Sequence, residues 1–368
     1  MKKDITIMIT GGGTGGHISP GVALYEEIKQ RDMKAIFLAG KNDRRFSTFD
    51  DMEEGDALFY GAPTFTVNPL KLPFFMIKFL FAFLKARRVI RKNNVSAVVG
   101  MGGYVSAPSL LAARSMKVPH FLCEQNSVPG RVTRLFEKSA FRIYGTLESS
   151  TGYLKNSAAF LHAGNPIRKE VIRKESKEEA RKAFHLGHCR QVILVIGGSQ
   201  GALNLNKLTF GLKKDYAREL KDVGIIWSTG AYSYDSFKEQ VQNEIDGGSI
   251  YMSPYIDRVG LAYRASDIAI SRSGAGVMME LAATGIPSLL IPYPHAADNH
   301  QDKNADDFVQ AGAAVKIADK EATPENVAPI LFDLLGNPRN LEKMSRQALE
   351  AARPDAAATI IDDMIQLL

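Results

Sequence analysis

The residues with the clearest chemical potential are a histidine and the glycines beside it. His17 ends the segment 11–17, which contains five glycines and follows an apolar run at 5–9. A similar pattern returns at 197–202, after the apolar run at 192–196. Glycines let a backbone approach a bound oxygen-rich group closely, and the start of a following helix offers unpaired N–H groups. The two loops therefore predict binding of phosphate or sugar groups, with His17 either as an acid/base group or as a group that only hydrogen-bonds the substrate.

Two further polar loops follow apolar runs in the first half of the chain. Residues 100–106 read Gly-Met-Gly-Gly-Tyr-Val-Ser and follow the run 97–99, and Glu124-Gln125-Asn126 follows the run 120–123. Ligands of open parallel sheets bind at the carboxyl ends of the strands, which is where these loops are expected. The carboxylate and the two amides of the second loop either bind sugar hydroxyls or cap a turn.

The second half of the chain contains a comparable set of residues. The segment 271–280 reads as the end of a strand, a loop of small residues and the start of a helix. Arg272 together with the N-terminus of that helix predicts a diphosphate site. Glu280, two turns into the helix, is suited to accept hydrogen bonds from two ribose hydroxyls. The polar loop 292–301 is a candidate selector of sugar hydroxyls.

The sequence argues against two common kinds of nucleotide site. No Asp-x-Asp triplet occurs, so the usual metal clamp for a diphosphate is missing, and helix dipoles and arginine must meet its charge. His295 and His300 flank Asp298, but their spacing does not suit one helix face, so we expect no metal there. The segment 12–17 lacks the third glycine of the dinucleotide fingerprint, and no acidic residue ends the second predicted strand, which argues against NAD. We therefore predict neither a metal nor a cofactor.

The elements that must position these loops are strands and helices in alternation. Near-continuous Val/Ile/Leu runs separated by helical patterns predict an α/β fold with two Rossmann-like, doubly wound parallel-sheet domains that face a cleft. Around Pro166 the pattern breaks, which divides the chain into a first domain at 1–165 and a second at 166–354, with a last helix at 355–368 that packs back on the first. The predicted strands are 5–9, 35–38, 97–99, 120–123, 192–196, 224–227, 268–271, 288–291 and 314–317.

The segment 71–92 predicts a helix with two different faces. It holds seven basic residues and no acidic one. One arc, at 100° per residue, carries Phe75, Phe79, Ala82, Phe83, Ala86 and Ile90 and is an ordinary core face. The other mixes aromatic and basic side chains, which suits an anionic membrane surface. A core helix with a solvated basic face is the alternative, and nucleic acid is a weaker one, so we expect no nucleic-acid partner. The second arc consists of Phe74, Lys78, Phe81, Lys85, Arg88 and Lys92.

Bulk composition narrows the class of protein. The chain has 368 residues, 45% hydrophobic and 23% charged, which is typical of a globular protein of two domains. Its net charge of +6 favours an anionic partner without selecting one. The two cysteines, Cys123 and Cys189, predict no disulfide framework, so we expect a reducing compartment. No uncharged apolar stretch is long enough to span a membrane.

Taken together, these motifs resemble those of the bacterial UDP-N-acetylglucosamine–lipid I N-acetylglucosaminyltransferases of peptidoglycan synthesis. The resemblance covers nearly the whole chain. It implies a glycosyltransferase-B fold at the cytoplasmic face of the inner membrane, and metal-independent, inverting transfer of GlcNAc from UDP-GlcNAc to the 4-hydroxyl of MurNAc in lipid I, which gives lipid II. Other proteins of cell-wall synthesis are implied as partners. The motifs are Gly12-Gly13-Thr14-Gly15-Gly16-His17 with Pro20, Gly100-Met101-Gly102-Gly103-Tyr104-Val105-Ser106, Glu124-Gln125-Asn126, Gly164-Asn165-Pro166-Ile167-Arg168, Gly197-Gly198-Ser199-Gln200-Gly201-Ala202, Arg272-Ser273-Gly274-Ala275 with Glu280, and His300-Gln301.

The resemblance also implies roles for individual residues. His17 would be the base or orient the acceptor, with Glu124 as the alternative base, and Ile256 would contact uracil through its backbone. Val277 departs from the threonine common in the family, and Ser19 from an aromatic residue. Acceptor contacts are implied for Gly102, Gly103, Tyr104 and Ser106. Donor contacts are implied for Thr14, Gly15, Gly16, Asn126, Arg168, Ser199, Ile256, Ala275, Gly276, Val277, Met278, Met279, Glu280 and Gln301.

Two other functions remain open from the sequence. One is a glycosyltransferase that builds a glycolipid on another lipid acceptor. The other is a peripheral membrane protein that senses a nucleotide and does not catalyse.

Overall fold

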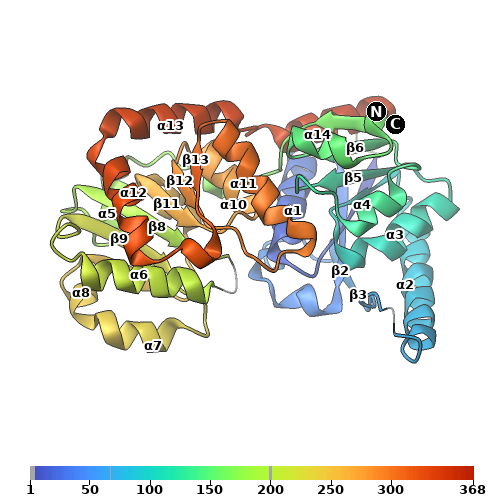
Figure 1. The fold of residues 1–368 in the computed structure, drawn as a ribbon. Coiled ribbons are helices and arrows are strands. Elements are labelled where there is room, and N and C mark those ends of the chain that lie inside the picture. The colour runs from blue at the N-terminus through green and yellow to red at the C-terminus, as the bar shows by residue number, and fades with distance from the viewer. Residues whose placement is uncertain (1–4, 67, 199–200) are drawn as a thin grey trace. The chain divides into compact units, whose positions relative to one another are not determined.

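The computed structural model describes residues 5–66, 68–198 and 201–368. The chain forms two compact units (Figure 1). Unit 1 consists of Met1–Arg168 and Arg353–Leu368, and unit 2 of Lys169–Ala352. Both units are α/β, and every strand pairing in both sheets is parallel, so the predicted fold class is confirmed.

Unit 1 contains, in its described residues, a seven-stranded sheet with the order β3-β2-β1-β4-β5-β6-β7. The order reverses between β1 and β4, so the loops after these neighbouring strands leave the sheet in opposite directions and open a crevice for a ligand. The strands are β1 (Thr6–Thr10), β2 (Lys34–Gly40), β3 (Ala57–Tyr60), β4 (Ala97–Gly100), β5 (His120–Glu124), β6 (Arg142–Gly145) and β7 (Phe160–His162).

Helices cover both faces of this sheet. Alternate side chains of the central strands point to opposite faces, where they pack on α1 and α14 on one side and on α2, α3 and α4 on the other. The chain's last helix is part of this core, because Ile360, Ile361 and Met364 are fully buried and Asp363 pairs with Arg142. The helices are α1 (Gly15–Gln30), α2 (Leu72–Lys92), α3 (Gly103–Ser115), α4 (Arg131–Phe136) and α14 (Ala356–Leu367), with 3-10 turns η2 (Lys41–Arg45), η3 (Ser47–Phe49), η4 (Glu148–Tyr153) and η5 (Ser157–Ala159).

Unit 2 repeats the arrangement with the strand order β10-β9-β8-β11-β12-β13. One face packs on α6, α7, α12 and α13, and the other on α5, α9 and α10. Its strands are β8 (Gln191–Ile196), β9 (Val223–Ser228), β10 (Ile250–Ser253), β11 (Ile268–Ser271), β12 (Ser288–Leu290) and β13 (Ala314–Lys316). Its helices are α5 (Lys177–Lys182), α6 (Leu203–Asp215), α7 (Tyr234–Lys238), α8 (Gln242–Asp246), α9 (Val259–Ala265), α10 (Ala275–Ala283), α11 (His300–Gln310), α12 (Pro324–Gly336) and α13 (Pro338–Ala351), with 3-10 turns η6 (Lys169–Val171), η7 (Glu239–Val241), η8 (Ala297–Asn299) and η9 (Asp319–Glu321).

All nine predicted strands exist, but the sequence prediction missed β3, β6, β7 and β10. Three of these are edge strands, and all four are at most four residues long. An edge or near-edge strand is only partly buried, so it lacks the continuous apolar run by which the central strands are found.

The helix at 71–92 forms as predicted, but it leaves more apolar surface exposed than expected. Its C-terminal half buries Ala82, Ala86 and Ile90, whereas Phe75, Phe79 and Phe83 are only half-buried. Most of the apolar side chains on its N-terminal half are exposed, and so is Leu84 beyond it; those of the N-terminal half are Leu72, Phe74, Met76, Ile77, Leu80 and Phe81.

Candidate active site

Three loops of unit 1 meet at one edge of its sheet. They follow β1, β4 and β5, which are neighbours, so the loops after Thr10, Gly100 and Glu124 lie side by side. Gly102 and Gly103 have φ angles of 91° and 71°, which side chains rarely adopt. A Cβ atom on Gly103 would lie 2.5 Å from the Gly12 carbonyl oxygen, so the first two loops are in direct contact.

His17 lies in the first turn of α1, against the second glycine loop. Its Nδ1 is 3.0 Å from the Thr14 hydroxyl, which fixes the ring. A Cβ atom on Gly102 would be 3.1 Å from His17 Nε2, so only glycine lets the imidazole sit this close to the loop. The imidazole is half-buried. The predicted grouping of His17 with the loop 100–106 is therefore present within unit 1.

Asp43 is a buried residue of this site that the sequence reasoning missed. It lies in η2 just after β2, is 3% exposed, and accepts hydrogen bonds of 3.0 Å from the backbone N–H groups of Gly13 and Gly40. A Cβ atom on Gly12 would clash with its Oδ2 at 2.0 Å. The carboxylate thus holds the first glycine loop in place. The available signal was an acidic residue three positions after the glycine that ends the second strand.

Buried hydroxyl groups donate hydrogen bonds to backbone carbonyls of the glycine loop 100–106. We expected Ser106 to face the acceptor, but its side chain is fully buried and donates to the carbonyl oxygens of Gly102 at 3.1 Å and Gly103 at 2.9 Å. The Tyr60 hydroxyl donates to the Val105 carbonyl, and burial raises the pKa of Tyr60 to about 12. These groups give the loop its shape.

Glu124 proves to be a loop-holding residue, which weakens its expected role as an alternative base. It is 4% exposed, and its carboxylate accepts hydrogen bonds from Asn126 N at 3.0 Å, Gly130 N at 2.9 Å and the Thr133 hydroxyl at 2.6 Å. Burial raises the pKa of the Glu124 carboxyl, although these donors oppose the shift. Its oxygens shape the turn 124–130 and so present Asn126 at the surface of the loop.

In unit 2, the N-terminus of α10 has the features of an anion site. The hydroxyl of Ser273 is buried and has no hydrogen-bond partner among the described residues. A Cβ atom on Gly274 or Gly276 would meet nothing within 4 Å, so the space above the first turn is open. The helix has no acidic residue in that turn and no side-chain cap, which leaves its N–H groups for a ligand. Val277, which has no hydroxyl to offer a ligand, is partly buried and packs against the core.

Arg272, which we expected at the diphosphate, has local partners within unit 2. Its side chain is 11% exposed. The Nη1 atom donates to the carbonyl oxygens of Ile291 and Pro292 at 3.0 and 3.2 Å and pairs with Asp319 at 2.5 Å. Through Nη1, Arg272 therefore holds the start of the polar loop 292–301 and Asp319 together.

The remaining predicted donor contacts fall in both units. Glu280 is half-buried on α10, and its Oε2 accepts a 2.6 Å hydrogen bond from the Tyr263 hydroxyl, a contact that the sequence did not reveal. The amide oxygen of Gln301 accepts from Tyr293 N at 2.9 Å and so helps to hold the polar loop. Ser199 lies outside the described residues. Thr14, Gly15, Gly16, Asn126 and Arg168 belong to unit 1, and Ile256, Ala275, Gly276, Val277, Met278, Met279, Glu280 and Gln301 to unit 2.

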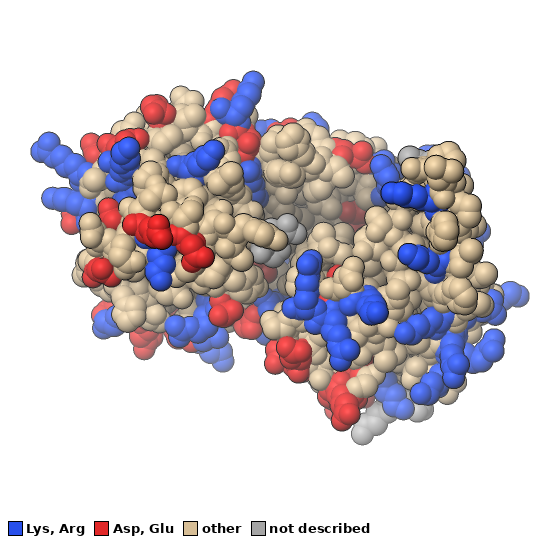
Figure 2. Space-filling view, turned by 90° about the horizontal axis from the view of Figure 1, so that it is seen from below, with Lys and Arg blue, Asp and Glu red and all other residues tan. Residues whose placement is uncertain are grey.

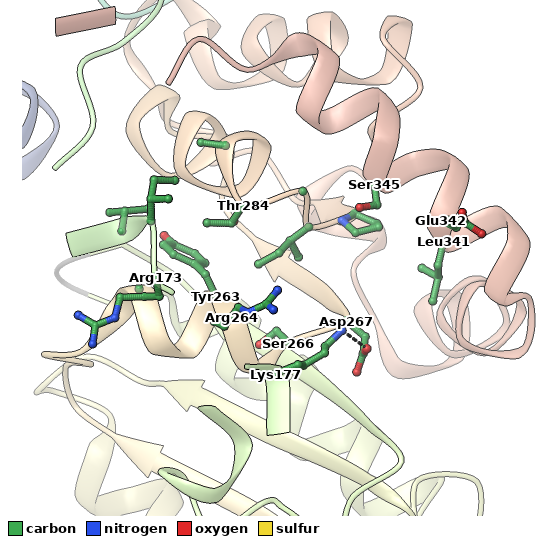
Figure 3. Close-up of a pocket in the computed structure, with 17 residues that line it drawn as sticks. Arg173, Lys177, Tyr263, Arg264, Ser266, Asp267, Thr284, Leu341, Glu342 and Ser345 are labelled. Atoms are coloured by element: carbon green, nitrogen blue, oxygen red, sulfur yellow. Dashed lines mark hydrogen bonds and ion pairs between the residues drawn. The ribbon is translucent and has the colours of Figure 1, made fainter. Parts of the chain in front are cut away.

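Unit 2 also contains a cavity of about 410 Å³ at the opposite edge of its sheet (Figure 3). Its lining includes Asp267 and Pro287, which immediately precede β11 and β12, so it lies at the amino ends of the strands. Ligands of such sheets bind at the carboxyl ends, so this cavity is separate from the candidate site.

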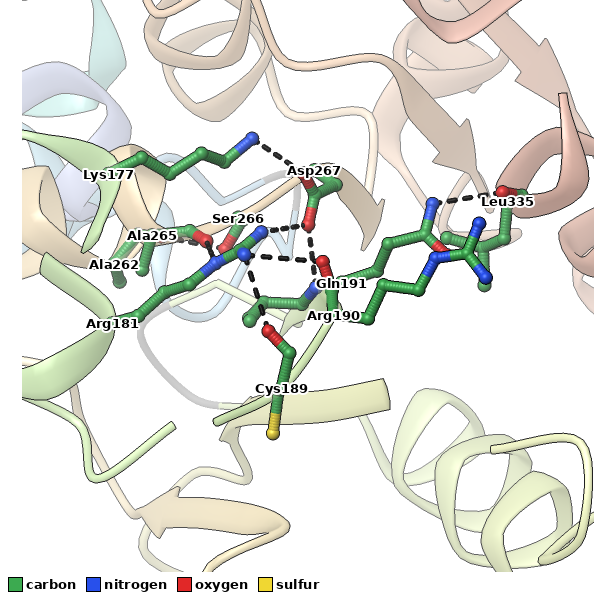
Figure 4. A network of polar contacts seen from close by, with 11 residues as sticks. Lys177, Arg181, Cys189, Arg190, Gln191, Ala262, Ala265, Ser266, Asp267 and Leu335 are labelled. Carbon is green, nitrogen blue, oxygen red and sulfur yellow. Dashed lines mark hydrogen bonds and ion pairs between the residues drawn. The ribbon is translucent and has the colours of Figure 1, made fainter. Parts of the chain in front are cut away.

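Asp267 is the centre of a polar network at the amino edge of the unit 2 sheet (Figure 4). Its carboxylate accepts from Lys177 Nζ and Arg181 Nη2, both at 2.5 Å, and from Val192 N at 2.7 Å. Arg181 also donates to the carbonyl of Ala265, the last residue of α9. The network therefore joins α5 to β8, to the end of α9 and to the segment just before β11.

Replacing Asp267 by asparagine is expected to lower the free energy of unfolding of unit 2 by about 2–3 kcal/mol, because two cationic groups lose their charged acceptor. Trp227 is the chain's only tryptophan and is buried in unit 2, so urea unfolding followed by its fluorescence reports on this unit. The matched control is Asp222→Asn, whose carboxylate is 67% exposed and should change stability by less than about 0.5 kcal/mol. Equal midpoints for the two variants would contradict the prediction.

Two models of one protein family match this chain, one in each half. The glycosyltransferase family 28 N-terminal domain matches residues 7–145, and the C-terminal domain of the same family matches 192–360. Two Rossmann-like units with these domains define a glycosyltransferase of the GT-B class. Among solved structures, Acinetobacter baumannii MurG aligns with a TM-score of 0.74 at 26% identity, covering 99% of this chain and all of that one. UDP-GlcNAc 2-epimerase from Neisseria meningitidis, at 14% identity and a TM-score of 0.68, shares the fold alone.

Relatives that match over their full length identify the family more narrowly. The chain is 33% identical over 378 residues to the UDP-N-acetylglucosamine–N-acetylmuramyl-(pentapeptide) pyrophosphoryl-undecaprenol N-acetylglucosamine transferase of Christiangramia forsetii, covering all of this chain and 99% of that protein. It is 34% identical to the protein of the same name from Geobacter sulfurreducens, covering 98% of each. The chain therefore belongs to this family of N-acetylglucosamine transferases, within glycosyltransferase family 28, and the resemblance seen in the sequence is confirmed.

Proposed function

We propose that this enzyme transfers GlcNAc from UDP-GlcNAc to the 4-hydroxyl of MurNAc in undecaprenyl-pyrophosphoryl-MurNAc-pentapeptide (lipid I), which gives lipid II. The observation that carries the proposal is the contact of His17 with the glycine loop at Gly102–Gly103, at the carboxyl edge of the unit 1 sheet. The names of full-length relatives support the choice of donor and acceptor.

The proposed chemistry is a single displacement with inversion. The acceptor hydroxyl attacks C1 of GlcNAc, a new glycosidic bond forms, and the bond from C1 to the diphosphate oxygen breaks. His17 takes the hydroxyl proton or orients the hydroxyl, with general-base assistance typically worth 10²–10⁴ in rate. Negative charge develops on the diphosphate of the departing UDP. The N–H groups at the N-terminus of α10 and the Ser273 hydroxyl stabilise this charge by hydrogen bonding.

The test is transfer of radiolabelled GlcNAc from UDP-GlcNAc to lipid I, with diacylglycerol as the competing acceptor. Labelled lipid II is the expected product, and it should form in excess EDTA because the proposed site uses no metal. Transfer to diacylglycerol alone would favour a glycolipid-forming enzyme. Donor binding without any transfer would favour a nucleotide sensor.

We propose further that unit 2 binds the donor and that Glu280 accepts hydrogen bonds from the ribose hydroxyls. Glu280→Ala is expected to raise the donor KM tenfold or more, since hydrogen bonds to a charged acceptor are worth about 1.5–3 kcal/mol. Steady-state kinetics with varied UDP-GlcNAc measure the change. Glu342→Ala, on α13 at the cavity of the opposite edge, is the control and should leave the KM unchanged. An unaltered KM in a folded Glu280 variant would rule out the ribose role.

We also propose that α2 attaches unit 1 to an anionic membrane at the cytoplasmic face of the inner membrane, where a polyprenyl acceptor remains. Phe74 and Phe81 are 69% and 68% exposed, and Phe65 and Leu70, in the segment before the helix, add to this apolar patch. Figure 2 shows Lys and Arg side chains gathered on the right-hand side of the view, where Figure 1 places α2. None of the described helices has the length and apolar character needed to cross a bilayer. Exposed aromatic and basic side chains support interfacial binding.

A further inference from the structure

Tyr263 is a fully buried tyrosine whose hydroxyl reaches a residue of the proposed donor site. It lies on α9, is 1% exposed, and packs in the core cluster of unit 2 that also contains Phe184 and Leu281. Its hydroxyl donates to Glu280 Oε2 at 2.6 Å. This length is typical of a charge-assisted O–H···O⁻ hydrogen bond, which is about twice as strong as a neutral one.

The surroundings of the ring fix the position of that hydroxyl. Tyr263 has only two side-chain torsions, and close packing in the core restrains both. One side of the ring faces the cavity at the amino edge of the sheet, which Arg264 and Thr284 also line (Figure 3). Since the Thr284 hydroxyl donates to the Glu280 backbone carbonyl at 2.8 Å, the backbone and the carboxylate of Glu280 are both anchored from this side.

Glu280 depends on such an anchor if it is to recognise two adjacent hydroxyls. A glutamate side chain has three torsions, and ordering it on binding opposes affinity. A carboxylate held at one oxygen presents a fixed plane to a ligand. Recognition sites that are rigid before binding avoid much of this entropic penalty.

We propose that Tyr263 is a positioning residue for the donor: it orients the Glu280 carboxylate for the ribose and so sets the preference for ribonucleotide over 2′-deoxyribonucleotide donors. The inference rests on the proposed function, in which Glu280 binds the ribose hydroxyls. Tyr263 itself acts only through Glu280.

The test compares UDP-GlcNAc with 2′-deoxy-UDP-GlcNAc as donors for the full-length enzyme. Tyr263→Phe keeps the ring in the core and removes one oxygen. We expect the KM for UDP-GlcNAc to rise about fivefold, because the Glu280 carboxylate must then be ordered on binding, with kcat changed less than about twofold. The KM for the deoxy donor should rise less, because it keeps only the 3′-hydroxyl for Glu280, so the preference for the ribonucleotide shrinks. Tyr216→Phe, whose ring packs on Phe332 in the same unit, is the matched control and should keep the wild-type preference.

A double mutant separates positioning from general destabilisation. If Tyr263 acts through Glu280, then adding Tyr263→Phe to Glu280→Ala should change the donor preference no further, and non-additivity of this kind is the mark of coupled residues. Loss of stability alone would affect both donors equally, and unfolding of each variant followed by Trp227 fluorescence measures it independently.

The outcomes distinguish the inference from its premise. If Glu280→Ala abolishes the preference and Tyr263→Phe retains it in full, the positioning role is wrong and the ribose role of Glu280 stands. If the wild-type enzyme uses both donors equally well, the ribose role itself is wrong and the inference falls with it. A reduced preference in Tyr263→Phe, absent from Tyr216→Phe, supports the proposal.

Discussion

Replacing His17 by alanine is expected to lower kcat for GlcNAc transfer by roughly 10²–10⁴, the range for loss of a general base. The reason is its position: the imidazole is fixed by Thr14 and lies against Gly102–Gly103, where the acceptor hydroxyl is proposed to bind. The measurement is the initial rate with saturating UDP-GlcNAc and lipid I. His188→Ala, an exposed histidine of unit 2, serves as the control and should retain full activity.

Two conservative variants separate a base from an orienting group. Glutamine at position 17 can offer an amide near the place of Nε2 but cannot accept a proton at neutral pH, whereas asparagine mimics Nδ1 and its contact with Thr14. If His17 is the base, both variants remain as slow as alanine. Recovery of most of the rate by glutamine would assign His17 to orientation. A decrease of less than tenfold in His17→Ala would place the base elsewhere.

Changing Lys78, Arg88 and Lys92 together to glutamine is expected to weaken binding to anionic vesicles roughly a hundredfold at low salt. Each basic side chain near an anionic surface contributes about 1 kcal/mol, and added salt screens the effect. Lys85, which we also expected on this face, is left unchanged because its Nζ donates to the Phe59 carbonyl at 2.7 Å and so supports the fold. Co-sedimentation with vesicles of anionic and of neutral lipid measures the difference.

The matched control removes the same charge from another part of the molecule. Lys214, Lys221 and Lys320 are exposed residues of unit 2, and their replacement by glutamine changes the net charge equally. If both triple variants lose affinity to the same degree, overall charge and not α2 drives attachment. If the α2 variant binds as well as the wild type at low salt, α2 is a core helix with a solvated face.

Features that repeat along the chain could be read from the sequence. The continuous apolar runs found every central strand of both sheets, because a strand buried on both faces must be apolar at every position. Glycine loops directly after these runs located the carboxyl edge of each sheet, since only glycine supplies the backbone angles found at Gly102 and Gly103. The spacing of apolar residues predicted the core face of the C-terminal half of α2, where Ala82, Ala86 and Ile90 are buried.

What only the tertiary structure decided is where individual polar side chains point. Arg272 and Glu124 have the residue types of a phosphate ligand and a base, yet local partners hold both, Asp319 in the first case and the turn 124–130 in the second. Asp43 and Tyr263 have ordinary sequence surroundings and gain their roles from partners 30 and 17 residues away. A hydrogen bond depends on the meeting of atoms from separate elements, so its geometry follows from packing and leaves no periodic signal in the sequence.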